Sequence, residues 1–369
     1  SPRAIQTVPP LTASLENSVC PLLSQQLGDA FAADSATVIE PAEARQLLRI
    51  VGTLLHSLHS AVPSCTATLI HAILRGASTS GTLWQRTQAL KVLRQICSDP
   101  TLLLHLYQHH DSKTVPGSEA FPVRDIVECF SETAAGYVKL AAPEDPTLSH
   151  LASIYSQKVA SGMQSDAFLE TVLPNGVSTE EAGALLTMLA IDCMLAMTGA
   201  IDLLADQVAG AVNDGRESQA DDIPPAKELV DRLTLFAQMV DSNWKSILSV
   251  LYQVLSCADG ETLVLELVKG YQRMIQTCGA IGAAEGLLLE SIRDRGIKAR
   301  DSFLSSLCEF TLSSDRETRS AIASPSAPDN TQTTPTTGSG GLKETLAGMG
   351  QRMGRSASGS TLQYGSAAQ

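Results

Sequence analysis

The fold class is decided by the stretch TLWQRTQALKVLRQICSDPTLLLHLYQHH, residues 82–110. Thr82 followed three residues later by Gln85 is a capping box, a pattern with which helices begin. Apolar residues then recur at helical spacing, at Leu90, Leu93 and Cys97. Asp99 before Pro100 marks a second helix start, because an acid at the N-cap and a proline at the first helical position both favour one. The stretch therefore predicts two successive amphipathic helices joined by a short turn.

The same pattern continues along the chain, in which 4% of residues are aromatic and strand-type alternation is almost missing. Further helices are predicted from Pro41 and Pro63, and over 12–33, 121–140, 148–160, 178–212, 224 onward, 259–278, 283–295 and 299–312. Successive antiparallel helices joined by short turns are typical of an α-solenoid. Because no fixed repeat period is found, the prediction is an all-α, irregular HEAT/armadillo-like solenoid of antiparallel helix pairs.

Composition limits the class of protein and of partner. The 369 residues are 44% hydrophobic, enough to bury one large core or two ordinary ones, which excludes a wholly disordered or fibrous chain. The net charge is -13 and no basic cluster occurs, so nucleic acid is not an expected partner. Eight cysteines lie far apart, which indicates free thiols and a reducing compartment. Since the chain starts at Ser1 without Met, we expect a piece of a longer protein.

Three segments differ in composition from the helical body. Residues 1–11 are predicted to be a flexible N-terminal segment, and 213–223 to be a charged linker. In residues 313–369, Ser, Thr, Gly and Pro make up 29 of 57 positions, too polar to offset the entropy of ordering. This last segment is predicted to be a disordered Ser/Thr/Gly-rich tail. It holds nearly balanced charges, so the acidity belongs to the body.

The sequence gives little support for a membrane span, a metal site, a phosphate-binding loop or a catalytic centre. The apolar run 184–205 contains Asp192 and Asp202, which are costly in a bilayer, so we interpret it as a buried helix of a soluble body. The histidines near positions 56–59 and 105–110 lack the partners of a metal site and are interpreted as surface or capping residues. Residues 279–286, GAIGAAEG, lack the lysine of a phosphate-binding loop. We predict no catalytic residue, metal or cofactor; a helical enzyme with an unrecognised site stays a distant alternative.

Residues 83–113 and 121–130 resemble the "homology upstream of Sec-seven" region of large Arf guanine-nucleotide exchange factors and their relatives. The residues that carry the resemblance are Trp84, Gln85, Arg86, Asp99, Asp111 and Asp125. In the exchange factors the acid at the Asp111 position usually follows a Tyr or Phe in an N-[YF]-D box. Here it follows His109 and His110. This departure favours the divergent Mon-two branch, the scaffolds named for monensin sensitivity.

Residues 239–312 resemble the helical segment that lies downstream of the catalytic domain in the exchange factors. Its markers are Trp244, Tyr271, Arg300, Asp301 and Phe303. The interval 131–238 is too short for the intervening catalytic domain and lacks its catalytic glutamate loop. A chain that retains both flanking regions and lacks the catalytic domain between them is similar to the Mon-two family.

The resemblance implies a division of the helical body. Residues 12–77 are similar to the end of the dimerisation/cyclophilin-binding region. Residues 78–212 are similar to the upstream homology region, and 224–312 to the downstream one.

The resemblance also implies a function: a non-catalytic scaffold in endosome-to-Golgi vesicle and protein trafficking. Implied partners are a Dopey-family protein, a type-four P-type ATPase that flips phospholipids, and Arf-like GTPases, with a homodimer possible. The implied location is the cytoplasmic face of the Golgi, trans-Golgi network and endosomes, as a peripheral protein. Because the body is acidic, we expect membrane association to be indirect, through proteins. The neighbouring alternative is the regulatory region of a large Arf exchange factor.

Overall fold

The computed structural model describes residues 9–31, 40–78, 81–112, 121–140, 147–162, 178–217, 226–258 and 260–323. It divides into a unit of residues 1–314 and a second of 315–369. The described elements are α2 (Pro9–Ser14), the π-helical turn η1 (Leu15–Val19), α3 (Cys20–Phe31), α4 (Pro41–Leu58), α5 (Pro63–Ala77), α6 (Leu83–Cys97), α7 (Pro100–Leu106), the π-helical turn η2 (Tyr107–Asp111), α8 (Pro122–Leu140), α9 (Thr147–Ser161), α11 (Thr179–Glu217), α12 (Ala226–Cys257), α13 (Glu261–Ala283) and α14 (Glu290–Ala323). None of these residues forms a strand, so the all-α prediction is confirmed.

Local hydrogen bonds start the helices where the sequence predicts. The backbone N–H of Thr82 donates to the side chain of Gln85 at 2.8 Å, and the N–H of Gln85 donates back to the Thr82 hydroxyl at 3.4 Å. The same reciprocal pair joins Ser178 and Glu181 before α11. Each capping box satisfies two N–H groups that a helix leaves without an internal partner. These starts are therefore properties of the local sequence.

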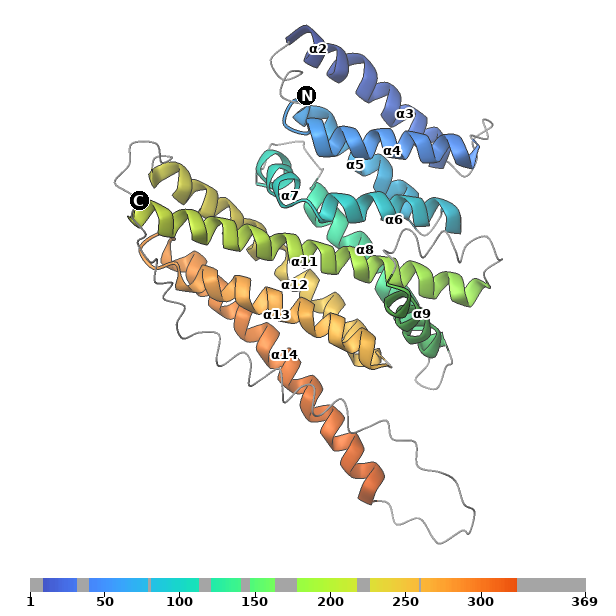
Figure 1. The fold of residues 1–369 in the computed structure, drawn as a ribbon, viewed down its shortest axis with the longest axis vertical. Helices are drawn as coiled ribbons and strands as arrows, with labels where there is room; N and C mark the ends of the chain where they lie inside the picture. The colour runs from blue at the N-terminus through green and yellow to red at the C-terminus, as the bar shows by residue number, and fades with distance from the viewer. Residues whose placement is uncertain are drawn as a thin grey trace, which may run out of the picture. The chain divides into compact units, whose positions relative to one another are not determined.

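Helix α11 is the core element of the first unit (Figure 1). It packs against α6, α8, α9, α12 and α13. Within it, 181–210 is long and apolar enough to cross a membrane, yet 89% of its most apolar window is buried among the other helices. Asp192 is 6% exposed and forms an ion pair inside this packing. The prediction of a helix buried in the protein body is confirmed for 184–205.

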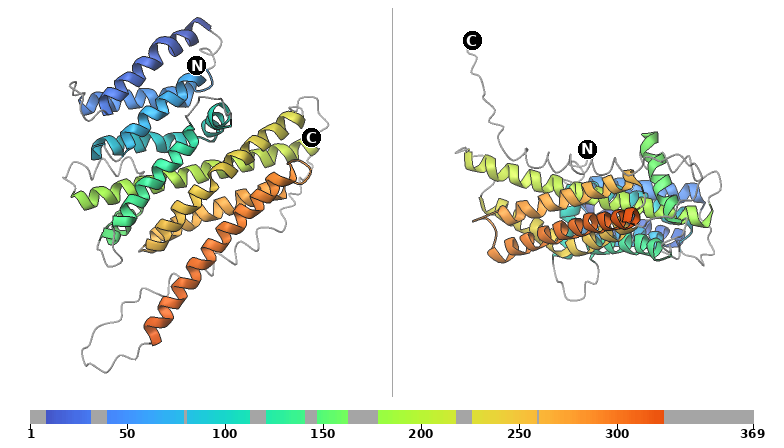
Figure 2. Two further views of the ribbon diagram at one scale, coloured as in Figure 1. Left: turned by 180° about the vertical axis from the view of Figure 1, so that it is seen from behind. Right: turned by 90° about the horizontal axis from the view of Figure 1, so that it is seen from below.

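The neighbouring helices form the α-solenoid that the sequence predicts. Helix α5 packs on α3 and α6, α4 packs on α6, and α8 packs on α12 (Figure 2). Each helix buries one apolar face; in α13, for example, Leu267, Tyr271 and Met274 are fully buried. Burial of apolar area contributes roughly 25 cal/mol per Å², which holds the helices in fixed positions.

Three predicted boundaries are wrong. The helices predicted at 283–295 and 299–312 are one helix, α14, because Gly296 lies inside it at a close contact with Ile281 of α13 and does not end it. The helix also continues to Ala323, past the predicted start of the tail at 313, since no glycine or proline interrupts it before Pro325. Helix α11 continues to Glu217, into the predicted linker 213–223. Residues 1–8, 218–225 and 324–369 lie outside the described part of the chain.

Candidate functional site

Three predicted site residues begin α6 and tie it to earlier helices. The Gln85 side chain donates from Nε2 to the backbone carbonyl of Ala30, in α3, at 2.9 Å. Arg86 donates from Nε to the carbonyl of Ala77, the last residue of α5, at 3.3 Å. Carbonyls at helix ends lack an internal partner, so these side chains cap α3 and α5. Trp84 beside them is half-buried.

Asp99 connects two helices as a cap. Its Oδ1 accepts hydrogen bonds from the backbone N–H of Thr101 at 2.9 Å and of Leu102 at 3.1 Å. Its Oδ2 lies 2.8 Å from Nδ1 of His56, in α4. Burial acts to raise the pKa of Asp99, but the hydrogen bonds from Thr101 and Leu102 and the charge of His56 outweigh it and lower the pKa. Asp99 therefore stays ionised as the start of α7.

Asp111 and Asp125 meet at the N-terminus of α8. Asp111 accepts hydrogen bonds from the backbone N–H groups of Val123 at 3.3 Å and Arg124 at 3.2 Å. Asp125 accepts one from the N–H of Phe121 at 3.3 Å. Burial raises the pKa of both carboxyls, that of Asp111 to about 6. The positive end of the helix dipole favours acids at this position, so both residues fit a capping role.

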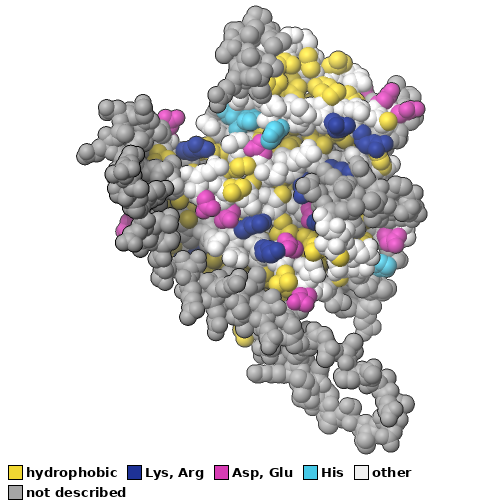
Figure 3. Space-filling view, viewed as in Figure 1, with side chains coloured by type: hydrophobic (Ala, Val, Ile, Leu, Met, Phe, Trp, Pro, Cys, Tyr) yellow, Lys and Arg dark blue, Asp and Glu magenta, His cyan; other side chains and the backbone are white. Residues whose placement is uncertain are grey.

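Histidines form a cluster that the sequence did not predict. The ring of His105 lies 4.8 Å from that of His59 and 4.2 Å from that of His109, centroid to centroid. Burial, followed by the neighbouring histidines, lowers the pKa of His105 to about 4, so the ring is neutral at pH 7. A group of histidine side chains is visible in Figure 3. Among the described residues no set of three His, Cys, Asp or Glu side chains is placed to hold a metal ion.

The downstream markers form a separate cluster of aromatic rings. Trp244, Tyr271 and Phe303 come from α12, α13 and α14 and are all buried. Phe303 lies between the other two rings, 6.4 Å from Trp244 and 5.8 Å from Tyr271. Arg300 and Asp301 pair with each other on the surface at 2.8 Å. Their side chains are 39% and 56% exposed, so this pair contributes little to stability and is open to a partner.

Residues 1–115 match the family model described as the HUS domain, Sec7-like, of Mon2/Sec7/BIG1-like proteins. The first third of the chain is similar to this domain. No curated protein matches the chain. The resemblance to the Sec7-related family is confirmed for this HUS-like region, as we name residues 1–115. Five of the predicted site residues lie within it: Trp84, Gln85, Arg86, Asp99 and Asp111.

The rest of the resemblance lies beyond this match. Asp125 and the downstream markers follow the HUS-like region in the chain, so their assignment to the family stays a prediction. The match also covers 12–77, where the assignment to the dimerisation/cyclophilin-binding region likewise stays a prediction. Within the HUS-like region, the predicted residues cap helices and join them; they do not converge on one reactive centre.

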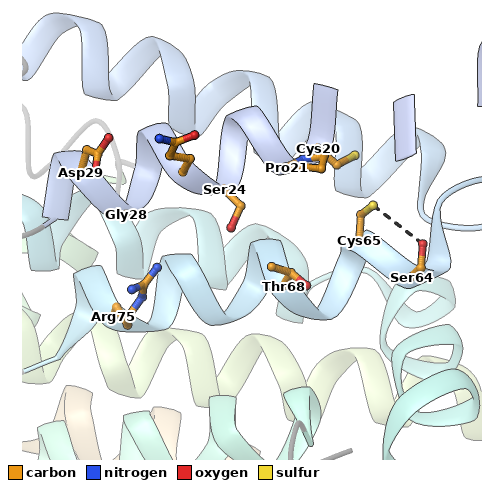
Figure 4. Close-up of a pocket in the computed structure, with 10 residues that line it drawn as sticks. Cys20, Pro21, Ser24, Gly28, Asp29, Ser64, Cys65, Thr68 and Arg75 are labelled. Carbon is orange, nitrogen blue, oxygen red and sulfur yellow. Dashed lines mark hydrogen bonds between the residues drawn. The ribbon is translucent and has the colours of Figure 1, made fainter. Parts of the chain in front are cut away.

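The HUS-like region also contains an open groove between α3 and α5 (Figure 4). Its volume is about 620 Å³, and its lining includes Cys20, Cys65, Asp29 and Arg75. Burial and the neighbouring Cys65 raise the pKa of Cys20 to about 12, which leaves the thiol protonated and a poor nucleophile. Figure 4 shows the two cysteines at one end of the groove and Arg75 with Asp29 at the other.

Proposed function

We propose that the chain is part of a non-catalytic helical scaffold in endosome-to-Golgi vesicle and protein trafficking. The match of residues 1–115 to a Sec7-like HUS domain carries the proposal, because that domain is a non-catalytic region of Sec7-like proteins. The perturbed carboxyls Asp99, Asp111 and Asp125 support it, since each accepts hydrogen bonds as a helix cap. Such acids hold helices together.

The proposed mechanism is docking on a rigid surface. Buried stripes and interhelix caps fix the positions of the helices, so exposed side chains present a constant surface to partners. The proposed partners are a Dopey-family protein, a type-four P-type ATPase flippase and Arf-like GTPases. The proposed location is the cytoplasmic face of Golgi and endosomal membranes. With a net charge of -13, the chain is expected to be recruited there by proteins and not by anionic lipid.

A second candidate is the regulatory region of a large Arf exchange factor. The matching family description names Sec7 and BIG1 beside Mon2, which favours keeping this candidate. The described part of 131–238 speaks for the scaffold, because α11 lies there as the core of the helical body. A gene that encodes a catalytic domain between these flanking regions would favour the exchange factor.

The test is affinity purification of partners with the full chain as bait, followed by mass spectrometry. The expected result is enrichment of a Dopey-family protein, a type-four flippase or an Arf-like GTPase over the amounts recovered with an unrelated helical protein of similar charge. Recovery of none of the three classes would contradict the scaffold proposal. Acceleration of nucleotide exchange on an Arf GTPase by the purified chain would contradict its non-catalytic part.

A further inference from the structure

A charged cavity lies where four helices meet. Its volume is about 400 Å³, and it is lined by Arg94 of α6, Lys158 of α9, Asp192 of α11 and Arg273 of α13. Three cations from three separate helices thus face one space in a chain whose net charge is -13. Bringing like charges together is unfavourable unless each finds a counter-charge or an acceptor.

The lysine in this cavity has its counter-charge. Nζ of Lys158 lies 2.5 Å from each carboxylate oxygen of Asp192. The hydroxyl of Tyr155 donates to the same carboxylate at 3.2 Å. The second acid in the lining, Glu266, accepts a hydrogen bond from Lys269 at 2.5 Å. Both acids therefore already have cationic partners from the chain.

Among the described residues, neither arginine has a carboxylate within ion-pair distance. The nearby acid of Arg273 is Asp202, and the charge of Arg273 acts to lower the pKa of that carboxyl. Arg273 donates from Nη1 to the backbone carbonyl of Leu195 at 3.2 Å. Arg94 has a buried Nε–H for which the described residues offer no acceptor. A buried donor without an acceptor is costly, so this atom indicates that an acceptor from outside completes the site.

We propose that this cavity binds a carboxylate side chain from an acidic segment of a partner protein, held between Arg94 and Arg273. The planar fork of a guanidinium matches the two oxygens of a carboxylate. Asp192 and Glu266 line the same space and would repel the greater charge of a phosphate. The apolar side chains of Val159 and Leu195, also in the lining, favour a peptide over a free ion.

This inference adds one docking site to the proposed scaffold. It rests on the proposed function, because only a scaffold would be expected to bind a segment of a partner protein here. The site is outside the HUS-like region except for Arg94. Its test uses a synthetic peptide and no trafficking protein. Failure of the purification experiment and failure of this binding site are therefore separate results.

The experiment measures binding of dye-labelled hexaglutamate to the full chain by fluorescence anisotropy at low salt, with hexaglutamine as the neutral peptide. We expect hexaglutamate to bind and hexaglutamine not to bind. R94Q and R273Q should each weaken binding about tenfold or more, because each removes one half of the clamp. R94K should fall between R94Q and the wild type, since it keeps the charge and loses the fork. R49Q, at an exposed arginine of α4 outside the cavity, should bind as the wild type does.

Four outcomes would overturn the proposal. The first is equal weakening by R94Q and R49Q, which would show general attraction between charges. The second is no binding of hexaglutamate by a wild type whose helical circular dichroism is intact. The third is displacement of the peptide by inorganic phosphate at equal concentration. The fourth is binding of hexaglutamate by the double variant D166N/E170Q but not by the wild type. That result would assign the carboxylates that pair with the two arginines to the chain itself. Because R94K keeps the charge and the bulk of the side chain, it tests the site even if R94Q unfolds.

Discussion

The ring of Tyr271 meets the ring of Phe303 edge-on, with centroids 5.8 Å apart and planes at 86°. The two rings join α13 to α14, and the Tyr271 hydroxyl extends this contact to the Ser306 hydroxyl, 3.0 Å away. Both side chains are fully buried. Edge-to-face contact adds to the burial of apolar area. These two markers of the predicted downstream region therefore act by holding α14 in place.

Replacement of Phe303 by Ala should cost about 3–5 kcal/mol of unfolding free energy, because it leaves a cavity between Trp244 and Tyr271. Urea unfolding followed by circular dichroism measures the change. The matched control is L304A at the next residue, whose side chain is 41% exposed and should cost much less. Equal losses in the two variants would show that the aromatic cluster is not the main attachment of α14.

The helix starts could be predicted from the sequence because their causes are local. Thr82 with Gln85, and Asp99 with Pro100, lie within three residues of each other and determine a cap by themselves. The continuity of α14 through Gly296 could not be predicted in this way. Gly296 indicated a break by its propensity, but its place is determined by Ile281 on another helix. Tertiary contact overrode propensity at that position.

The contacts of the candidate site residues could not be predicted from the sequence. Asp111 was identified by family resemblance, and its contacts with Val123 and Arg124 join residues 12 and 13 positions apart. Asp192 drew attention in the sequence for its cost in a membrane, and its ion pair with Lys158 joins residues 34 positions apart. Helical periodicity determines which face of a helix is apolar, but it does not determine which helix covers that face.

Replacement of Gly296 by Ala should destabilise the chain by about 1–3 kcal/mol, since the new Cβ would lie 2.8 Å from the Cγ2 atom of Ile281. The control is G136A in α8, where a Cβ meets nothing within 4 Å. That change should stabilise by about 0.5–1 kcal/mol, because Ala favours a helix interior. Thermal unfolding measures both variants. A stabilising effect at position 296 would contradict the close packing of α13 on α14.

Asp111 should make stability fall as the pH rises. Its pKa is raised from 3.8 to about 6 in the folded chain, so the folded state binds the proton more tightly than the unfolded state. This contribution is fully present below about pH 4 and is lost as the pH rises through 6. The wild type should lose about 1–3 kcal/mol relative to D111N between pH 4 and pH 7. Urea unfolding of both variants across this range measures the difference in unfolding free energy. A wild type that gains stability relative to D111N as the pH rises would contradict the raised pKa of Asp111.

Removing only the lysine of the Lys158–Asp192 ion pair should lower the unfolding free energy more than removing both charges. K158M should cost about 3–5 kcal/mol, because it removes the ammonium group from an ion pair whose acid, Asp192, is 6% exposed. Combining K158M with D192N should recover most of this loss, since the amide is neutral and its oxygen still accepts from the Tyr155 hydroxyl. Urea unfolding of the two variants decides the matter. A double variant no more stable than K158M would show that the lysine stabilises by packing and not by charge.

The acidity of the chain should keep it off anionic membranes. Each lysine or arginine near such a surface contributes about 1 kcal/mol of attraction, and each acid opposes it. The chain holds 26 Lys and Arg against 39 Asp and Glu.

We therefore expect the purified full chain to stay in the supernatant when phosphatidylserine liposomes are sedimented at about 150 mM salt. The same result is expected with neutral liposomes. Lower salt lengthens the range of charge repulsion and should not bring the chain down. Sedimentation of the chain with the anionic liposomes but not with the neutral ones would contradict this prediction. It would show direct binding to anionic lipid, because the two kinds of liposome differ only in that lipid.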